Sequence, residues 1–184
     1  MRNGDFSSFR VLIVPGLHGS GPDHWQTRWQ QLHPWFERVE QARWDVPDIQ
    51  AWSGRVEEAL RRSVRPTLLV AHSFGCLASV HAASAGMPQL AGALLVAPAD
   101  PDKFGIGQQM RVRRLSRPSL VVGSMNDPWM AARRAANWAD TWRSGFINAG
   151  ALGHINAESN LGDWEYGLAL LKLLANDTSL IAAA

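Results

Sequence analysis

The sequence predicts a single α/β domain in which helices cover both faces of a parallel β-sheet. Two patterns along the 184 residues lead to this prediction. Short, wholly apolar segments recur, as is typical of strands that are buried on both faces. Between them lie segments in which apolar residues return every three or four positions, as they do on one face of a helix. Ligands bind beyond the carboxyl ends of such strands, so functional residues are expected in the loops that follow them.

Three strands are predicted in the first half of the chain, over residues 11–14, 38–44 and 67–71. The helix after the first strand has Trp25, Trp29 and Leu32 on its apolar face and ends before Pro34. Asp48 is expected to cap the helix that precedes the third strand, because its carboxylate can accept hydrogen bonds from free amides of the first turn.

Three further strands are predicted in the second half, over residues 91–97, 119–123 and 146–148. One helix is expected to open at Pro128 and a last one to be capped by Asp163. The connection 98–118 has a weak pattern and is too short for an inserted domain. We therefore expect only a small flap there, with Phe104 and Ile106 over an open site.

Length and composition agree with one globular domain over residues 1–184. The chain is 46% hydrophobic and 18% charged, as expected for a protein with an ordinary core. The single cysteine, Cys76, excludes an internal disulfide. No apolar run reaches the roughly 18 residues of a membrane helix, and no secretion signal is recognisable. We expect flexible ends (1–9 and 177–184), no membrane contact and a cytoplasmic location.

The net charge of +2 comes mostly from arginine, and four arginines cluster between residues 111 and 117. A nucleic-acid site would need aromatic residues among them or a recognised binding motif, and neither is present. The cluster fits a solvated loop before a strand. No nucleic-acid partner is therefore expected.

The segment 67–77 organises the chemistry. An apolar strand runs into His72-Ser73-Phe74-Gly75, and a helical pattern follows at once. This is the layout of a nucleophile elbow, in which a serine projects from a sharp strand-to-helix turn. Gly75 suits the close approach of strand and helix, whereas Ala71 stands where a glycine is usual. Taken alone, Ser73 has a second interpretation, as a simple helix cap.

An acid and a base are predicted at the ends of later strands. Asp127 follows the fifth strand and His154 the sixth, so the order Ser, Asp, His is that of α/β-hydrolases. Asp127 also precedes a proline and would be a good helix cap by itself. Asp100, after the fourth strand, is the alternative acid, followed by Asp102.

Other histidines compete with His154 for the role of base. His81 lies on the helix after the elbow and is expected to be structural. His72 alternates away from the serine and is expected to be packed. His18 and His24 lie in the loop after the first strand, which is the wrong position in the chain order. A loop histidine after the last strand can reach the serine, so His154 is the predicted base.

Five motifs stand near the predicted strand ends: Pro15-Gly16-Leu17-His18-Gly19-Ser20-Gly21-Pro22-Asp23-His24-Trp25-Gln26, Ala71-His72-Ser73-Phe74-Gly75-Cys76, Ala93-Leu94-Leu95-Val96-Ala97-Pro98, Asn126-Asp127-Pro128 and Gly153-His154-Ile155-Asn156. Together they resemble the YdeN and retinoblastoma-binding-protein-9 family of small serine hydrolases over nearly the whole chain. The resemblance implies a minimal α/β-hydrolase fold of about six mostly parallel strands without a cap domain. It also implies a triad of Ser73, Asp127 and His154 that hydrolyses ester or amide bonds.

An oxyanion hole is expected from two backbone amides. One is that of Phe74, at the start of the helix after the serine. The other is that of Leu17 in the glycine-rich loop, with His18 as second choice. This loop is not a phosphate loop, because no Gly-Lys-Ser/Thr sequence follows it. Five residues are predicted to bind substrate: His18, Trp25, Phe104, Trp129 and Ile155.

The predicted function is that of a carboxylesterase-like serine hydrolase that cleaves small acyl esters or amides through an acyl-enzyme. The partner is a small-molecule acyl substrate, and no metal or organic cofactor is required. The protein is expected to be a monomer or a small homo-oligomer. Two alternatives remain at this point: a thioesterase or acyltransferase, and a non-catalytic interaction protein on a hydrolase scaffold.

Overall fold

The computed structural model of the chain describes residues 6–182 and the side chains of residues 6–177. Six strands form one sheet in the order β2-β1-β3-β4-β5-β6, and all five pairings are parallel. The strands are β1 (Arg10–Val14), β2 (Glu37–Arg38), β3 (Thr67–His72), β4 (Leu90–Val96), β5 (Ser119–Gly123) and β6 (Gly145–Asn148). The predicted α/β class with a parallel sheet is confirmed.

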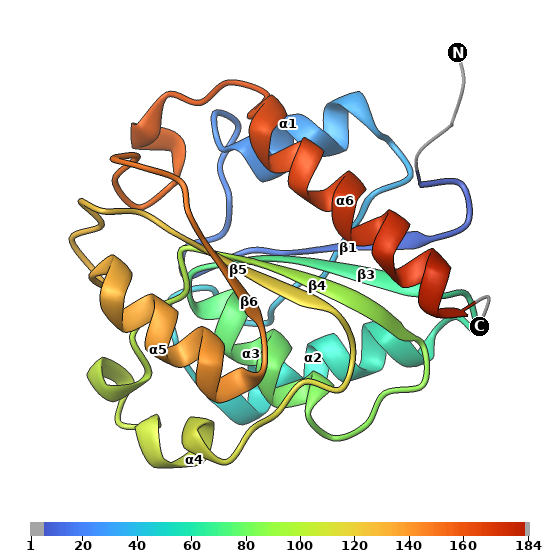
Figure 1. Cartoon of the computed structure of the whole chain (residues 1–184), viewed down its shortest axis with the longest axis horizontal. Helices are drawn as coiled ribbons and strands as arrows, with labels where there is room; N and C mark the ends of the chain where they lie inside the picture. Colours follow the sequence, from blue (N-terminus) through green and yellow to red (C-terminus); the bar gives the residue numbers. More distant parts are fainter. Residues whose placement is uncertain (1–5, 183–184) are drawn as a thin grey trace.

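Helices cover both faces of this sheet (Figure 1). They are α1 (Trp25–Leu32), α2 (Ile49–Arg61), α3 (Phe74–Ala83), α4 (Gly107–Arg111), α5 (Ala132–Trp142) and α6 (Glu165–Ala182), with short 3₁₀ turns η1 (Pro101–Phe104) and η2 (Ala157–Ser159). Helices α1 and α6 lie on one face, and α2, α3 and α5 on the other. Among the described residues, no helix has both the length and the apolar character needed to cross a bilayer.

Two hydrophobic cores result, one on each face of the sheet. Successive side chains of a strand point to opposite faces, so Leu69 of β3 packs into the core under α2 and α3, while its neighbours Leu68 and Val70 pack under α1 and α6. All six residues of β3 are buried. This double burial explains why the strand is apolar throughout rather than alternating.

The predicted site lies at the carboxyl ends of the strands, where the order of the strands in the sheet reverses direction. The chain passes from β1 outward to β2 and then returns to β3, which pairs with the other side of β1. The loops that leave β1 and β3 therefore diverge above the sheet and leave a crevice between them. The predicted oxyanion loop follows β1, and the predicted nucleophile follows β3.

Several elements differ from the sequence-based predictions. The second strand has only two residues, Glu37 and Arg38, rather than spanning 38–44. The chain beyond it leaves the sheet because its carbonyls bond elsewhere: that of Trp44 accepts from the His18 amide, and that of Val46 from the Trp52 indole. The connection 98–118 is also more ordered than predicted, since it contains η1 and α4.

The helix boundaries after β5 and β6 also differ. Helix α5 begins at Ala132 and not at Pro128. Helix α6 begins at Glu165, and the carboxylate of Asp163 accepts a hydrogen bond from Arg28 of α1 at 2.7 Å. The carboxylate of Asp163 thus contacts α1, whereas that of Asp127 accepts a local hydrogen bond from the Trp129 amide in a turn that ends before α5.

The expected flexible ends cover residues 1–9 and 177–184. Residues 1–5 and 183–184 lie outside the described part of the chain. Phe6 and Phe9 are buried in the core under α1 and α6, and α6 continues to Ala182. Leu32 was predicted to lie on the apolar, core-facing side of α1, and this prediction is wrong. Leu32 is 51% exposed, whereas Trp25 and Trp29 of the same helix are buried.

Gly75 allows the first turn of α3 to lie against the end of β1. A Cβ atom at this position would lie 2.4 Å from the carbonyl oxygen of Pro15 and 2.5 Å from that of Val14. Backbone atoms at both contacts cannot move aside without disturbing the sheet. The elbow therefore depends on a glycine at this position.

Replacing Gly75 by alanine is expected to lower the free energy of unfolding by about 1–3 kcal/mol or more, as overpacked sites do. The matched control is Gly54→Ala in α2, where an added Cβ meets no atom of the described residues within 4 Å. That change should raise stability by about 0.5–1 kcal/mol, because alanine loses less backbone entropy in a helix. Urea unfolding of both variants measures the difference, and equal stabilities would contradict the close approach.

Candidate active site

Ser73 stands in a strained turn between β3 and α3. Its φ of 53° and ψ of −123° place a non-glycine residue in a region that costs on the order of 1–3 kcal/mol. Gly16, in the loop after β1, leaves room for this turn, since a Cβ there would lie 2.7 Å from the Ser73 Cβ. The side chain of Ser73 makes no helix-capping hydrogen bond. The interpretation of Ser73 as a simple cap is therefore wrong.

The structure brings Ser73, His154 and Asp127 into one hydrogen-bonded series. The His154 Nε2 lies 3.0 Å from the Ser73 Oγ. On the other side of the ring, Nδ1 lies 2.9 Å from Oδ2 and 3.1 Å from Oδ1 of Asp127. An ionised carboxylate only accepts hydrogen bonds, so Nδ1 bears the proton of the neutral ring. Nε2 then has a free lone pair directed at the serine hydroxyl.

Asp127 is held for this contact rather than for capping a helix. Its side chain is 2% exposed, and Oδ1 also accepts from the Trp129 amide at 2.8 Å. That turn delays α5 until Ala132. The carboxylate is thus fixed from both sides, by its own loop and by the histidine.

The loops that contain Asp127 and His154, the predicted acid and base, are bonded to each other. Asn126 accepts from the Gly153 amide at 2.7 Å and from the Ser124 hydroxyl at 3.0 Å. The same hydroxyl oxygen accepts from the Leu152 amide at 2.9 Å. The sequence marks Asn126 only as a part of the Asn-Asp-Pro motif. Its role as a link between two strand ends becomes visible only in the fold.

Two backbone amides remain available beside the serine. Among the described residues, neither the Leu17 amide nor the Phe74 amide has a hydrogen-bond acceptor. The amide of His18 donates to the Trp44 carbonyl at 2.8 Å. His18, the second choice for the oxyanion hole, is therefore excluded as a backbone donor, because its single backbone N–H is already used.

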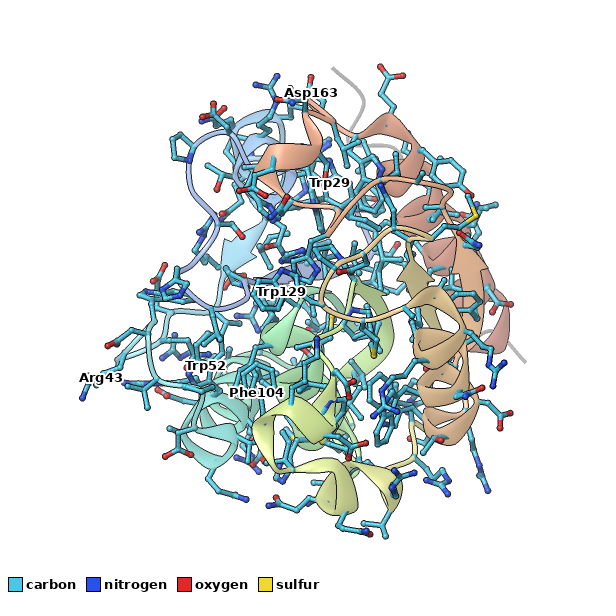
Figure 2. The ribbon with its side chains drawn as sticks, turned by 90° about the vertical axis from the view of Figure 1, so that its left-hand side faces the viewer. Trp29, Arg43, Trp52, Phe104, Trp129 and Asp163 are labelled. Carbon is cyan, nitrogen blue, oxygen red and sulfur yellow. The ribbon has the colours of Figure 1, made fainter. Side chains whose placement is uncertain are left out.

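A cavity of about 560 Å³ opens over Ser73. Its walls include three of the predicted substrate-binding residues, His18, Phe104 and Trp129. Trp129 is 58% exposed at the rim. Figure 2, which faces this side of the molecule, shows Trp129 and Phe104 near the centre of the face. A volume of this size suits a small organic ligand.

Three predicted contributors to this pocket lie elsewhere. Trp25 and Ile155 are buried beneath the site, at 1% and 0% exposure, and neither lines the cavity. Ile106, expected on the flap, packs into the core under α3. Their apolar character is used for packing, a role that the sequence alone does not distinguish from lining a pocket.

The alternative acid, Asp100, lines the cavity but is already paired. Its carboxylate accepts from Nε and Nη2 of Arg134 at 2.5 and 2.9 Å, and Arg134 also contacts Asp102. The Lys103 ammonium of η1 donates to the Trp129 carbonyl at 2.6 Å. These contacts tie the short flap to the segment that contains α5. Nothing in the local sequence indicated either pairing.

Two further buried histidines, His24 and His72, form a series of ring contacts with His154. The rings of His24 and His72 lie 4.7 Å apart, and those of His72 and His154 lie 4.9 Å apart. Burial lowers the pKa of His24 to about 3, and the charges of Arg38 and His154 add to this. Burial likewise holds the pKa of His72 well below its ordinary value. Both rings are therefore neutral at neutral pH.

The buried His24 should make the protein sensitive to acid. Its pKa is about 6.5 in the unfolded chain and about 3 in the fold, so the unfolded state binds more protons between these values. The contribution of His24 to the free energy of unfolding is therefore fully present above pH 6.5. It falls by about 1.4 kcal/mol per pH unit as the pH drops toward 3. Above pH 6.5 it contributes no slope.

His24→Asn tests this pH dependence. The Nδ1 of His24 caps α1 by accepting from the Gln26 amide at 3.2 Å, and an asparagine side chain can replace that cap without titrating. Urea unfolding between pH 4.5 and 7.5 should show a shallower loss of stability for the variant, by about 1.4 kcal/mol per pH unit. Parallel curves for the two proteins would contradict the assignment.

The fold and the placement of these residues at the strand ends define an α/β-hydrolase. Comparison with known proteins identifies the family within this class. The family described as Serine hydrolase matches residues 11–173. A solved structure described as a YdeN-like hydrolase from Pectobacterium atrosepticum is 38% identical, with a TM-score of 0.89, over 93% of this chain and 92% of that chain. The chain therefore belongs to the serine hydrolase family, among its YdeN-like members.

More distant structures share the fold. The ydeN gene product of B. subtilis is 19% identical, with a TM-score of 0.72, over 91% of this chain and 98% of that one. An esterase domain from Rhodothermus marinus is 14% identical, with a TM-score of 0.61, over 91% and 88% of the two chains. At such identities the similarity shows the fold alone. No curated protein sequence matches the chain.

Proposed function

We propose that the protein is a carboxylesterase-like hydrolase that cleaves small acyl esters through an acyl-enzyme on Ser73. One observation supports this most directly. The Ser73 hydroxyl, the His154 ring and the Asp127 carboxylate form a continuous series, with contacts of 3.0 and 2.9 Å, at the wall of a cavity of about 560 Å³. A serine hydroxyl is a weak nucleophile at neutral pH, and such a series supplies the base that it needs.

Acylation begins when the His154 Nε2 takes the Ser73 proton as Oγ attacks the ester carbonyl carbon. The carbonyl oxygen becomes negative and is held by the amides of Leu17 and Phe74, whose N–H groups have no acceptor within residues 6–182. Asp127 stabilises the imidazolium that forms and keeps its Nδ1 proton in place. The imidazolium then protonates the leaving alcohol, and the acyl group stays on Oγ.

Deacylation repeats these steps with water. The neutral His154 takes a proton from a water molecule, which attacks the acyl-enzyme carbonyl. The same two amides hold the second oxyanion, and His154 returns the proton to the Ser73 Oγ as the carboxylic acid leaves. In each half-reaction His154 passes on the proton that it takes, and Ser73 regains in the second the proton that it loses in the first, so these steps require no cofactor.

A small acyl group is the substrate that this site favours. The cavity has apolar walls from Leu17, Ala99, Phe104 and Trp129, and only η1 and α4 stand where larger hydrolases have an inserted domain. Apolar walls favour an acyl chain or an aromatic acyl group over a charged one. The volume of about 560 Å³ limits its length.

The test combines turnover with labelling of the nucleophile. The wild-type protein is expected to hydrolyse p-nitrophenyl esters, with kcat/KM highest for short chains, and to react with a fluorophosphonate. Peptide mass spectrometry should locate the adduct on Ser73. Added alcohols or thioester substrates identify transfer or thioesterase activity in the same assay. A folded protein that shows no turnover and no adduct would overturn the proposal.

A further inference from the structure

The loop that contains His154 is held from beneath by two buried side-chain donors. The His72 Nε2 lies 2.9 Å from the carbonyl oxygen of His154. The Trp25 Nε1 donates to the next carbonyl, that of Ile155, at 2.8 Å. A carbonyl oxygen can only accept, so the His72 Nε2 bears the proton. Two successive carbonyls thus accept from α1 and from the end of β3.

These hydrogen bonds act on a turn with an unfavourable backbone. Ile155 has a φ of 48°, in the left-handed region that β-branched residues rarely adopt. Its amide donates to the Leu152 carbonyl at 3.1 Å, and its side chain is fully buried. Such a conformation persists only where the surroundings enforce it, and strained residues of this kind cluster at active sites.

The turn at Ile155 holds the stretch of chain that carries His154. Ile155 follows His154 directly, so its backbone angles set the direction of the chain at the base. His72 in turn precedes Ser73 directly, at the end of β3. The nucleophile is therefore joined to the backbone of the base by one side chain. A neutral His72 does this without placing a positive charge beside the imidazolium that forms during catalysis.

We propose that His72 and Trp25 are positioning residues, which fix the loop of His154 so that its Nε2 stays within hydrogen-bond distance of the Ser73 Oγ. The inference rests on the proposed function, since it assigns a catalytic consequence to the geometry of the loop. His72 does not exchange protons with substrate in this scheme. Both residues act through His154.

His72→Leu removes one donor and Trp25→Phe removes the other while keeping a ring. Misplacing a reacting group by about 1 Å can cost on the order of 100-fold, so kcat for His72→Leu should fall about 10- to 100-fold. KM should change much less, because Trp25 does not line the cavity and His72, which does, is not among the proposed acyl contacts. Trp25→Phe should show a smaller loss of kcat, since His72 still holds the neighbouring carbonyl.

His72→Gln is the conservative variant. The amide nitrogen of glutamine can occupy the place of the histidine Nε2, so this variant should recover most of the kcat lost in His72→Leu. A merely structural role would not produce that recovery. The fluorophosphonate labelling rate should follow kcat across the series, because both depend on the Ser73–His154 contact.

Two matched controls lie away from the site. His81 is buried on α3 and contacts Arg113, and Trp142 is buried on α5 and donates to the Met110 carbonyl. His81→Leu and Trp142→Phe make the same chemical changes and should leave kcat unchanged in the folded fraction. Thermal unfolding of every variant separates loss of fold from loss of positioning.

Amide hydrogen exchange of residues 152–156 gives a readout that needs no substrate. It should be faster in His72→Leu and in Trp25→Phe than in the wild type or the two controls. If His72→Leu does not fold, Trp25→Phe is the variant that tests the inference. Unchanged kcat together with unchanged amide exchange in Trp25→Phe would then overturn it. Active wild-type protein with a fully active His72→Leu variant overturns the inference alone, whereas inert wild-type protein overturns the proposed function.

Discussion

Ser73→Ala is expected to abolish hydrolysis, with kcat/KM falling on the order of 10⁴- to 10⁶-fold, as in other enzymes that lose a nucleophilic serine. The reason is chemical, because alanine has no oxygen to form the acyl-enzyme. The small volume change at a half-buried position should leave the fold intact. Stopped-flow or long-time ester assays would measure the residual rate.

Ser79→Ala is the matched control for this change. Ser79 lies on the same helix, α3, is 1% exposed, and its hydroxyl has no hydrogen-bond partner among the described residues. Its removal should leave activity and labelling unaltered. Ser73→Ala protein that still hydrolysed esters at the wild-type rate, or still formed a fluorophosphonate adduct, would place the nucleophile elsewhere.

Asp127→Asn has the second largest expected effect, with kcat falling roughly 10³- to 10⁴-fold, as when a triad acid becomes an amide. An asparagine NH₂ can donate to the His154 Nδ1, which leaves the proton of the neutral ring on Nε2. That nitrogen then faces the Ser73 hydroxyl as a donor and cannot take its proton. KM should change little. Steady-state kinetics at a pH where the wild type is fully active would measure the loss.

Asp100→Asn distinguishes Asp127 from Asp100, the first alternative acid that the sequence offered. Asp100 lies at the cavity, but both of its oxygens accept from Arg134. Neutralising it should weaken this ion pair and lower stability, while kcat falls far less than for Asp127→Asn. The reverse order of the two effects would make Asp100 the acid and contradict the role given to Asp127.

The short flap, residues 98–118, forms one wall of the cavity over Ser73 without covering it. Residues 98–118 form only η1 and α4. Three contacts hold the end of this segment that faces the cavity: Arg134 with Asp100 and Asp102, and Lys103 with the Trp129 carbonyl. Met110 and Arg113, at its other end, contact Trp142 and His81. On this side the cavity wall therefore comes from two short segments, around Phe104 and Trp129, that are bonded to each other. Its dimensions follow from these contacts rather than from a separate domain.

Local patterns were sufficient for much of the architecture. Strands that are buried on both faces must be apolar throughout, so β1, β3, β4 and β5 are visible as short apolar runs. A sharp strand-to-helix turn also has a local signature in small residues, which is why Ser73 and Gly75 could be identified. The sequence also shows that serine, aspartate and histidine each follow a predicted strand. Parallel strands bring their carboxyl ends to one edge of the sheet, so the three residues could be expected to lie together.

Long-range contacts decided the rest. The pattern that makes Trp25 and Ile155 apolar does not tell whether they line a pocket or lie beneath it, and the fold places both beneath. Asp127 has every local sign of a helix cap, but His154, from a loop 27 residues away, takes its carboxylate. The pairing of His72 with the His154 carbonyl joins residues 82 apart. Hydrogen-bond partners of buried polar groups are chosen by tertiary packing, and therefore only the three-dimensional structure reveals them.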